Sequence, residues 1–324
     1  MGIGNCHKVM DFRQVAKRRL PAPVFHYIDG GADDEWTLRR NTDAFDDYEL
    51  LPAHLSDVSS IEMASTMFGK PVDWPVMISP TGASRLFHAD GEPAVARAAD
   101  KFGMPYSLST VGTTTIEDIG AIGEVPKVFQ IYVFRDRGIT RSFVERCKAS
   151  GYTALCLTVD TPVAGNRERD NYYGMMATAK PALRSVPSML RHPGWLYRAV
   201  IRKDMELVNV KSDLNEQKFT DMSVKDFIDS QFDRSLTWRD VEWLAQEWGG
   251  PLIIKGVQTT HDCRNAADAG ATAVMLSNHG GRQLEGAPAP VDCIADVADA
   301  MGDRLEIICD GGIRRGSHIV KALA

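Results

Sequence analysis

Short apolar runs recur along the chain, and each of them ends in polar residues or glycine. Seven such runs show little alternation of apolar and polar residues, and amphipathic helix patterns separate most of them. They occupy residues 75–79, 105–110, 127–133, 154–160, 251–256, 273–278 and 305–310. Strands that are apolar on both faces and alternate with helices indicate a parallel sheet covered by helices. The pattern therefore predicts an α/β protein.

Two helices between these strands have a clear apolar face. The faces expected to be buried consist of Val95, Ala98, Ala99 and Phe102 in residues 90–102, and of Ile139, Phe143 and Cys147 in the second helix. The strands start about 22 to 33 residues apart, which favours a (β/α)₈ barrel over a doubly wound sheet. We expect one domain over residues 1–324, with a helical N-terminal segment.

Two irregularities interrupt this rhythm. The fourth and fifth strands start about 97 residues apart, and we expect an insertion at about 175–235, because long segments of this kind are lids, binding loops or disordered. The sequence "RRGSHIVKALA" at the end reads as a helix, and no eighth strand follows it. A barrel does not close on seven strands, so we expect either a C-terminally truncated chain or closure by another segment.

Composition excludes several classes of protein. The net charge of −6 and the absence of a basic cluster argue against nucleic acid as a partner. Six cysteines without a CxxC pair, and without a secretory leader, are typical of reduced thiols in a cytoplasmic protein. No stretch approaches the roughly 20 apolar residues of a membrane-spanning helix.

Every predicted strand carries polar or glycine residues to its carboxyl end, where a parallel barrel places its active site. An unpaired buried polar group costs about 1–3 kcal/mol, so a barrel without a function would need none of these residues. They are Pro80, Thr81 and Gly82; Ser109 and Thr110; Gln130 and Tyr132; Thr158 and Asp160; Lys255; Asn278, His279 and Arg282; and Asp310, Gly311 and Gly312.

Three of these residues suggest acid–base chemistry. His279 is a candidate general base, because an ordinary histidine accepts a proton near neutral pH. Alone it would more often be a structural residue of a turn, and Asp160 alone would more often cap a helix. Together, Asp160 could orient the imidazole, and Arg282 could bind an anion beside it.

Lys255 and the segment "DGGIRRG" at 310–316 suggest a cofactor or phosphate site. A lysine at the end of an apolar strand forms a Schiff base or supplies fixed positive charge, and a lysine that reaches solvent is an equally good interpretation. Glycines before a helix let backbone N–H groups approach phosphate oxygens, although Asp-Gly-Gly is also a common turn.

These residues resemble the FMN-dependent L-2-hydroxy acid dehydrogenases and oxidases, a family that includes L-lactate and mandelate dehydrogenases and glycolate oxidase. The resemblance covers essentially the whole chain. It rests on "FHYIDGGADDEWTLRRN", "SPTGASRLFHADGE", "SLSTVGTTTIED", "FQIYVFRDR", "LTVDTPVAGNRERD", "LIIKGV", "SNHGGRQLEG" and "DGGIRRGSHIVKALA".

The resemblance implies an FMN enzyme that oxidises an L-2-hydroxy acid to the 2-oxo acid. It assigns His279 as the base and Asp160 as its partner, and it places Lys255 beside the flavin ring, which weakens the Schiff-base interpretation. The substrate contacts it implies are Tyr27, Tyr132, Arg167 and Arg282. The FMN contacts are Pro80, Thr81, Gly82, Ser109, Gln130, Thr158 and Lys255 at the ring, and Asp310, Gly311, Gly312 and Arg314 at the ribityl chain and phosphate.

Substrate and acceptor follow less directly from the resemblance. Val111, in "STV", is similar to the lactate dehydrogenases rather than to glycolate oxidase, so we expect L-lactate, with electrons passed to quinone or another acceptor. Gly82 and the "RHPGW" segment, with Arg198, Arg202 and Lys203 nearby, suggest peripheral membrane contact as an alternative to a soluble protein. The family also implies a homo-oligomer, often a tetramer.

Three other functions stay open on the sequence. The first is an oxidase that passes electrons to O₂ and releases hydrogen peroxide. The second is a fragment that lacks FMN and is inactive or serves as a binding module, because the family's further phosphate contact on the eighth strand is absent from this chain. The third is a Schiff-base aldolase on Lys255.

Overall fold

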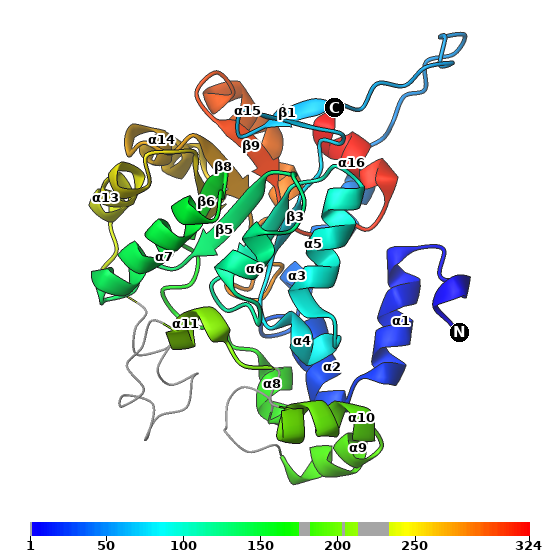
Figure 1. Ribbon diagram of the computed structural model, residues 1–324. Coiled ribbons are helices and arrows are strands. Elements are labelled where there is room, and N and C mark those ends of the chain that lie inside the picture. Colours follow the sequence, from blue (N-terminus) through cyan, green and yellow to red (C-terminus); the bar gives the residue numbers. More distant parts are fainter. Residues whose placement is uncertain (1, 175–181, 203–204, 213–232) are drawn as a thin grey trace.

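The computed structural model describes residues 2–174, 182–202, 205–212 and 233–324. All seven expected strands are present, and each pairs in parallel with the next one along the chain. They are β3 (Ile78–Thr81), β4 (Tyr106–Ser109), β5 (Lys127–Ile131), β6 (Ala154–Thr158), β7 (Leu252–Val257), β8 (Ala273–Leu276) and β9 (Glu306–Cys309). The curled sheet, seen in Figure 1, confirms the barrel-like α/β fold.

Within the described residues this sheet has seven strands, as the sequence predicts, and β3 and β9 form its two edges. The first expected strand, 75–79, begins later than predicted, at Ile78.

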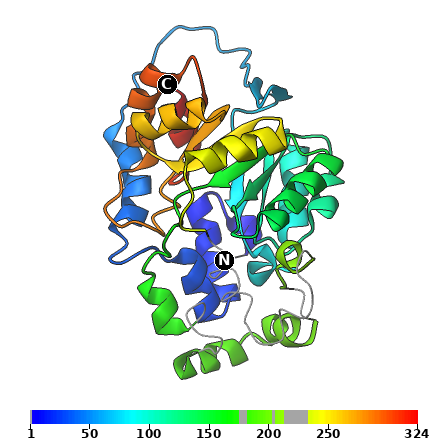
Figure 2. The same ribbon diagram turned by 90° about the vertical axis from the view of Figure 1, so that its left-hand side faces the viewer.

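Helices pack on the outer face of the sheet (Figures 1 and 2). They are α5 (Gly91–Lys101), α6 (Ile116–Gly120), α7 (Arg137–Ala149), α13 (Trp238–Trp248), α14 (Thr260–Asp268) and α15 (Ile294–Met301), with η6 (Pro290–Cys293) before α15 and α16 (Gly316–Leu323) after β9. The outward-facing strand residues, such as Leu108, Phe129 and Leu155, form the larger apolar core with these helices. The short helix α4 (Ser84–Phe87) lies instead beside α2 (Ala22–Asp29), against which its Leu86 and Phe87 pack.

The inward-facing residues form a second, smaller core. Side chains alternate along a strand, so Val128, Cys156 and Ile253 point to the side opposite their neighbours in the chain. A hairpin of β1 (Ser65–Met67) and β2 (Lys70–Val72), which the sequence pattern does not predict, packs Met67, Phe68 and Val72 against this inner core.

The expected buried face is right for α7 and mostly wrong for α5. Ile139, Phe143 and Cys147 are buried. In α5, Ala99 is buried as expected, but Val95 and Phe102 are 39% and 52% exposed, and the rest of the buried face includes Glu92 and Ala96. A pattern of apolar residues does not predict this buried face, because Glu92, at the start of the face, is charged.

The N-terminal segment is helical, as expected. It contains η1 (Ile3–Asn5), α1 (Val9–Arg19), α2 (Ala22–Asp29), α3 (Trp36–Asp43) and η2 (Ala44–Asp47). Between β6 and α13 lie α8 (Glu168–Tyr173), η3 (Leu183–Ser185), α9 (Val186–Leu190), α10 (Pro193–Leu196), the π-helix η4 (Tyr197–Arg202) and α11 (Val208–Ser212). The expected insertion at about 175–235, with Lys203, lies partly outside the described residues.

Candidate active site

The inward-facing positions change from apolar to polar toward the carboxyl ends of the strands. The strand register sets Ser109 beside Gln130 and Thr158 beside Lys255. Leu276 lies beside Cys309, so the residues that follow, Ser277 and Asp310, are also neighbours. The polar ends of strands that are distant in sequence therefore meet at one end of the sheet, where a parallel barrel places its chemistry.

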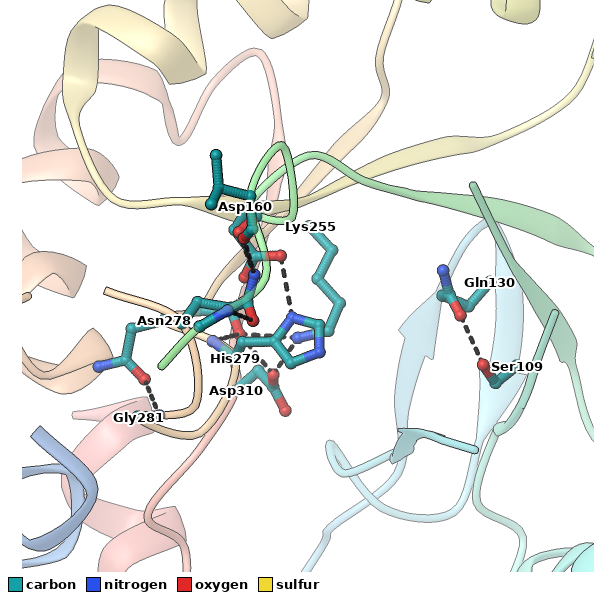
Figure 3. Close-up of polar contacts among 12 residues, drawn as sticks. Ser109, Gln130, Asp160, Lys255, Asn278, His279, Gly281 and Asp310 are labelled. Atoms are coloured by element: carbon teal, nitrogen blue, oxygen red, sulfur yellow. Dashed lines mark hydrogen bonds and ion pairs between the residues drawn. The ribbon is translucent and has the colours of Figure 1, made fainter. Parts of the chain in front are cut away.

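His279 and Asp160 form a hydrogen-bonded pair at this end (Figure 3). His279 Nδ1 lies 2.9 Å from Asp160 Oδ1. Both side chains are largely buried, at 27% and 12% exposed. Because Nδ1 is engaged by the carboxylate, Nε2 is the nitrogen left to exchange a proton with another molecule. This is the pairing that a general base and its orienting carboxylate require.

The loop after β6 brings Asp160 close to β7. A Cβ atom on Gly256 would lie 2.6 Å from Cβ of Asp160, so a side chain at residue 256 would displace the carboxylate. The side-chain amide of Gln283 donates to the carbonyl oxygen of Asp160 at 3.0 Å. Residue 283 comes four positions after the histidine, so the same loop fixes both members of the pair.

Lys255, Ser277 and Asp310 form a buried polar cluster. Figure 3 shows Lys255 and Asp310 next to the His279–Asp160 pair. Lys255 Nζ donates to Ser277 Oγ at 2.7 Å and also to Asp310. Burial alone would lower the pKa of Lys255, but the charges of Asp310 and Asp160 raise it. Burial would raise the pKa of Asp310, yet Lys255 lowers it to about 2. The lysine is therefore a fixed buried cation rather than a neutral nucleophile.

Arg282 and Arg167 approach the ring of Tyr27 from the loops after β8 and β6. Their guanidinium carbons lie 5.3 Å and 5.5 Å from the ring centroid. Arg282 donates to the carbonyl oxygens of Tyr27 and Gly30 at 2.9 Å and 2.6 Å. Burial, followed by the charge of Arg167, lowers the pKa of Arg282. Arg167 Nε also lies 3.2 Å from Oδ2 of the buried Asp170, so one carboxylate faces the two arginines. The net positive charge that remains in this poorly solvated place favours the binding of an anion.

Tyr132 follows β5 and faces the same region. Burial raises the pKa of its hydroxyl, and the negative charge of Asp160 raises it further. The phenol therefore stays protonated at neutral pH, and its O–H can donate a hydrogen bond near the histidine and the two arginines.

Ser109 and Gln130 lie at another part of this end (Figure 3), and Thr158, at the end of the intervening strand β6, lies between them and Lys255. Ser109 Oγ donates to Gln130 Oε1 at 2.7 Å. Gln130 Nε2 and Thr158 Oγ1 are buried without a hydrogen-bond partner among the described residues. A buried donor without a partner is costly, so these atoms fit a group that brings its own acceptors, as the carbonyl oxygens and nitrogens of a flavin ring do.

The chain that follows β3 packs closely against Val111. Pro80 and Thr81 belong to the strand, and Gly82 follows it. A Cβ atom on Gly82 would lie 2.5 Å from a methyl group of Val111, so only glycine fits against this side chain.

The Asp310–Arg314 segment forms a glycine turn before α16. Gly311 and Gly312 have φ values of +111° and +75°. A Cβ atom on Gly312 would lie 1.8 Å from the carbonyl oxygen of Asn41. Arg314 donates to the carbonyl oxygen of Ile313 at 2.8 Å, and burial lowers its pKa. Glycine is therefore required at residue 312 because the backbone of α3 occupies the space that a side chain would need.

Several residues of the site received no role from the sequence. Ser277 joins Lys255, Asp310 and the backbone N–H of His279, from which its Oγ accepts at 3.0 Å. Ser277 directly precedes Asn278 and His279 in the sequence, and this position could have marked it as a site residue. Asn41 and Glu285, from α3 and from the loop after β8, also contact this end, but nothing in the local pattern indicates contacts so distant in sequence.

Comparisons with known proteins agree with this geometry. The chain is 39% identical over 318 residues to an L-lactate dehydrogenase of Vibrio parahaemolyticus, covering 97% of this chain and 83% of the relative. Its fold matches the crystal structure of the monotopic membrane protein (S)-mandelate dehydrogenase with a TM-score of 0.90 and 35% identity, over 99% of this chain and 84% of that one. A mandelate oxidase variant with (S)-mandelic acid matches with a TM-score of 0.80 and 29% identity, over 98% and 82% of the two chains.

The model of one protein family, described as FMN-dependent dehydrogenase, matches residues 16–324. The matched residues include all seven strands of the sheet, the polar residues at the strand ends and the N-terminal helices α2 and α3. The chain therefore belongs to the FMN-dependent dehydrogenase family and is an FMN-dependent 2-hydroxy acid oxidoreductase.

Proposed function

We propose that this protein oxidises L-lactate to the 2-oxo acid with FMN as its cofactor. The observation that carries the proposal is the His279–Asp160 pair, which lies at the same end of the sheet as the two arginines around Tyr27. A base beside an anion site is what a 2-hydroxy acid requires, because its carboxylate must be bound while its hydroxyl loses a proton.

In this proposal each side chain has a separate task. Arg167 and Arg282 bind the substrate carboxylate, assisted by the hydroxyl groups of Tyr27 and Tyr132. His279 Nε2 accepts the hydroxyl proton, and Asp160 stabilises the imidazolium that forms. Arg282 now donates to two backbone carbonyls, so we expect it to exchange at least one of them for the substrate carboxylate.

The residues at the carboxyl end of the sheet, on its inward-facing side, fit FMN. Gln130 and Thr158 would meet the polar edge of the ring, with Ser109, Pro80, Thr81 and Gly82 beside it. Asp310, Gly311, Gly312 and Arg314 would hold the ribityl chain and phosphate. When bound, FMN would accept the Cα hydrogen of the substrate together with the two electrons. Lys255 supplies fixed positive charge on this side, which favours the extra negative charge of the reduced cofactor.

L-Lactate is the substrate we favour, because the most similar relatives include L-lactate dehydrogenases and because Val111 is aliphatic and packs against Gly82. Quinone or another acceptor would take the electrons onward. A mandelate oxidase among the similar structures supports O₂ as the alternative acceptor.

We further propose that residues 1–324 act as one hydroxy acid dehydrogenase domain in the cytoplasm, forming a homo-oligomer and touching the membrane surface. A similar structure is that of a monotopic membrane protein. No helix in the described ranges is long and apolar enough to cross a membrane. Contact would instead use the exposed apolar residues of α9 and η4, namely Val186, Leu190, Tyr197, Val200 and Ile201, with Arg198 and Arg202 on the same segment.

The purified protein, mixed anaerobically with L-lactate, glycolate or (S)-mandelate, tests the proposal through bleaching of the flavin absorbance. We expect the fastest bleaching with L-lactate. Faster bleaching with glycolate or (S)-mandelate would overturn the assignment of L-lactate as the substrate. A protein that is colourless after titration with FMN and removal of unbound FMN would overturn the proposal that it acts as a flavin enzyme. Hydrogen peroxide formed in step with lactate consumption in air would establish the oxidase instead.

A further inference from the structure

Two buried asparagines join the N-terminal segment to the loop that carries His279. Asn41 lies in the last turn of α3, and Asn278 immediately precedes the histidine. Asn41 Nδ2 donates to Asn278 Oδ1 at 2.7 Å, and Asn278 Nδ2 donates back to Asn41 Oδ1 at 2.6 Å. The two residues are 2% and 4% exposed. This reciprocal amide pair is therefore shielded from water.

Asn278 uses its full hydrogen-bonding capacity. Besides the two bonds to Asn41, its Oδ1 accepts from the backbone N–H of Gly281 at 3.0 Å (Figure 3), and its Nδ2 donates to the carbonyl oxygen of Pro288 at 3.0 Å. An amide side chain offers two donors and two acceptor lone pairs, and all four are engaged. The side chain thus spans the turn that contains His279 and Gly280.

This turn needs external support, because His279 is in a left-handed conformation. Its φ is +59°, in the left-handed region that residues with a Cβ atom rarely adopt, because the Cβ atom crowds the backbone. Asp160 fixes the far end of the imidazole, but the direction of Nε2 also depends on the backbone at residue 279. The bond from Gly281 to Asn278 closes the turn around that backbone.

Other contacts bring α3 against the same loop. The backbone N–H of Ala32 donates to the carbonyl oxygen of Gly281 at 2.9 Å. Glu285 accepts from the N–H groups of Trp36 and Thr37, at the start of α3. The helix is therefore docked on the loop at both of its ends, and Asn41 is its side chain that reaches toward the histidine.

We propose that Asn41 is a positioning residue for the proton acceptor His279 and acts through Asn278. The inference rests on the proposed function and deepens it, because it extends the machinery of proton transfer to a helix that is not part of the barrel. Without the Asn41 amide, Asn278 loses two of its four hydrogen bonds and is held only by the bonds to Gly281 and Pro288. The turn around residue 279 then relaxes, and Nε2 loses its direction.

The test uses the FMN-loaded enzyme and the rate constant of anaerobic flavin reduction at saturating L-lactate, expressed per bound flavin. Asn41→Asp keeps the shape of the side chain but removes the donor to Asn278 Oδ1, and Asn41→Ala removes both bonds. We expect each to slow reduction by roughly 10- to 100-fold, since a misplacement of about 1 Å costs on the order of 10²-fold. KM should change by less than about 3-fold, because the arginines are unaffected.

Asn278→Ala and the double variant Asn41→Ala/Asn278→Ala complete a double-mutant cycle. If Asn41 acts through Asn278, the double variant reduces its flavin no more slowly than Asn278→Ala alone. Additive losses, or wild-type rate constants in both Asn41 variants, would overturn the inference. If Asn41→Ala fails to fold, Asn41→Asp takes its place in the cycle, alone and combined with Asn278→Ala.

A matched control is Thr140→Val in α7, which removes another buried hydrogen bond, to the backbone N–H of Phe134 at 3.3 Å, far from the histidine loop in sequence. We expect it to lower stability and to leave reduction per bound flavin unchanged. A similar slowing in this control would show that loss of stability alone explains the effect, and would overturn the inference. If the wild type itself is not reduced by any hydroxy acid, the proposed function fails, which is a different outcome.

Discussion

At the scale of single residues, the site consists of ionisable side chains whose protonation is set by their neighbours. Lys255 and Asp310 are buried together, and each keeps the other charged. His279 faces Asp160 through one nitrogen and leaves the other for the substrate. The strand register places these groups side by side, and the proposed reaction uses both charge and direction.

A change at His279 tests its proposed role as the proton acceptor. In His279→Gln the side chain still fills the space and can bond to Asp160, but it accepts no proton at neutral pH. We expect flavin reduction by L-lactate to slow by roughly 10²- to 10⁴-fold, the usual contribution of general base catalysis. Stopped-flow absorbance measures this rate, and the yellow colour reports retained FMN. If the variant is colourless, His279 is instead a structural residue.

At the scale of elements, one carboxylate joins a helix to two loops of the site. Glu92 lies in the first turn of α5 and is fully buried. It accepts hydrogen bonds from the backbone N–H of Ser84 at 3.0 Å and from the backbone N–H and hydroxyl of Thr113, the former at 2.8 Å. The loops after β3 and β4, which carry Gly82 and Val111, thus share one anchor.

Glu92 makes the stability of the fold depend on pH. Burial raises its pKa, but the hydrogen bonds from Thr113 and the backbone outweigh burial, so the pKa is lowered on folding. The stabilisation is therefore present above the unfolded pKa of about 4.3 and is lost as the pH falls through the lower, folded value. Glu92→Gln should lose about 1–3 kcal/mol at pH 7 and less in acid.

Urea unfolding of wild type and Glu92→Gln at pH 7 and at a series of lower pH values, down to about 3, measures this difference. The gap between the two unfolding midpoints should stay nearly constant above the unfolded pKa of Glu92 and narrow as the pH falls below it toward the lower, folded pKa, where the wild-type side chain becomes neutral as well. A gap that stays the same over the whole series would show that the charge of Glu92 contributes nothing.

At the scale of the whole molecule, the segment after β6 gives the protein an apolar outer surface. Leu190, Val200 and Ile201 are between 61% and 67% exposed, whereas Trp195 of the same segment packs against Val24 and Phe25 of α2. The segment is thus amphipathic, with one side on the N-terminal helices and the other in solvent. A surface of this kind suits shallow insertion into a lipid headgroup region.

Sedimentation with vesicles of anionic phospholipid tests the proposed membrane contact. We expect the wild type to bind, and Leu190→Glu and Ile201→Glu each to weaken binding by about 10-fold or more, since each buried apolar side chain contributes roughly 1.5–3 kcal/mol. Val58→Glu removes an equally exposed apolar residue elsewhere, at 72% exposure, and should bind as the wild type does. Equal binding by all four proteins would rule out contact through this segment.

The seven strands of the parallel sheet, their order and the residues at their ends can be predicted from the sequence alone, because apolar runs and strand-end motifs are local patterns. The sequence also identified His279, Asp160 and Lys255 as candidates, and their mutual contacts follow from the register of a parallel sheet. It missed most of the buried face of α5, because apolar periodicity does not register a carboxylate that is buried by hydrogen bonds.

The tertiary structure alone decided how the N-terminal segment meets the site. Asn41 and Asn278 are 237 positions apart, and neither belongs to an apolar pattern. Their pairing depends on where α3 docks, which the whole sheet and its helices determine together. Periodicity records which side of an element is buried. The partner of a buried polar group depends instead on the packing of elements that are distant in the chain.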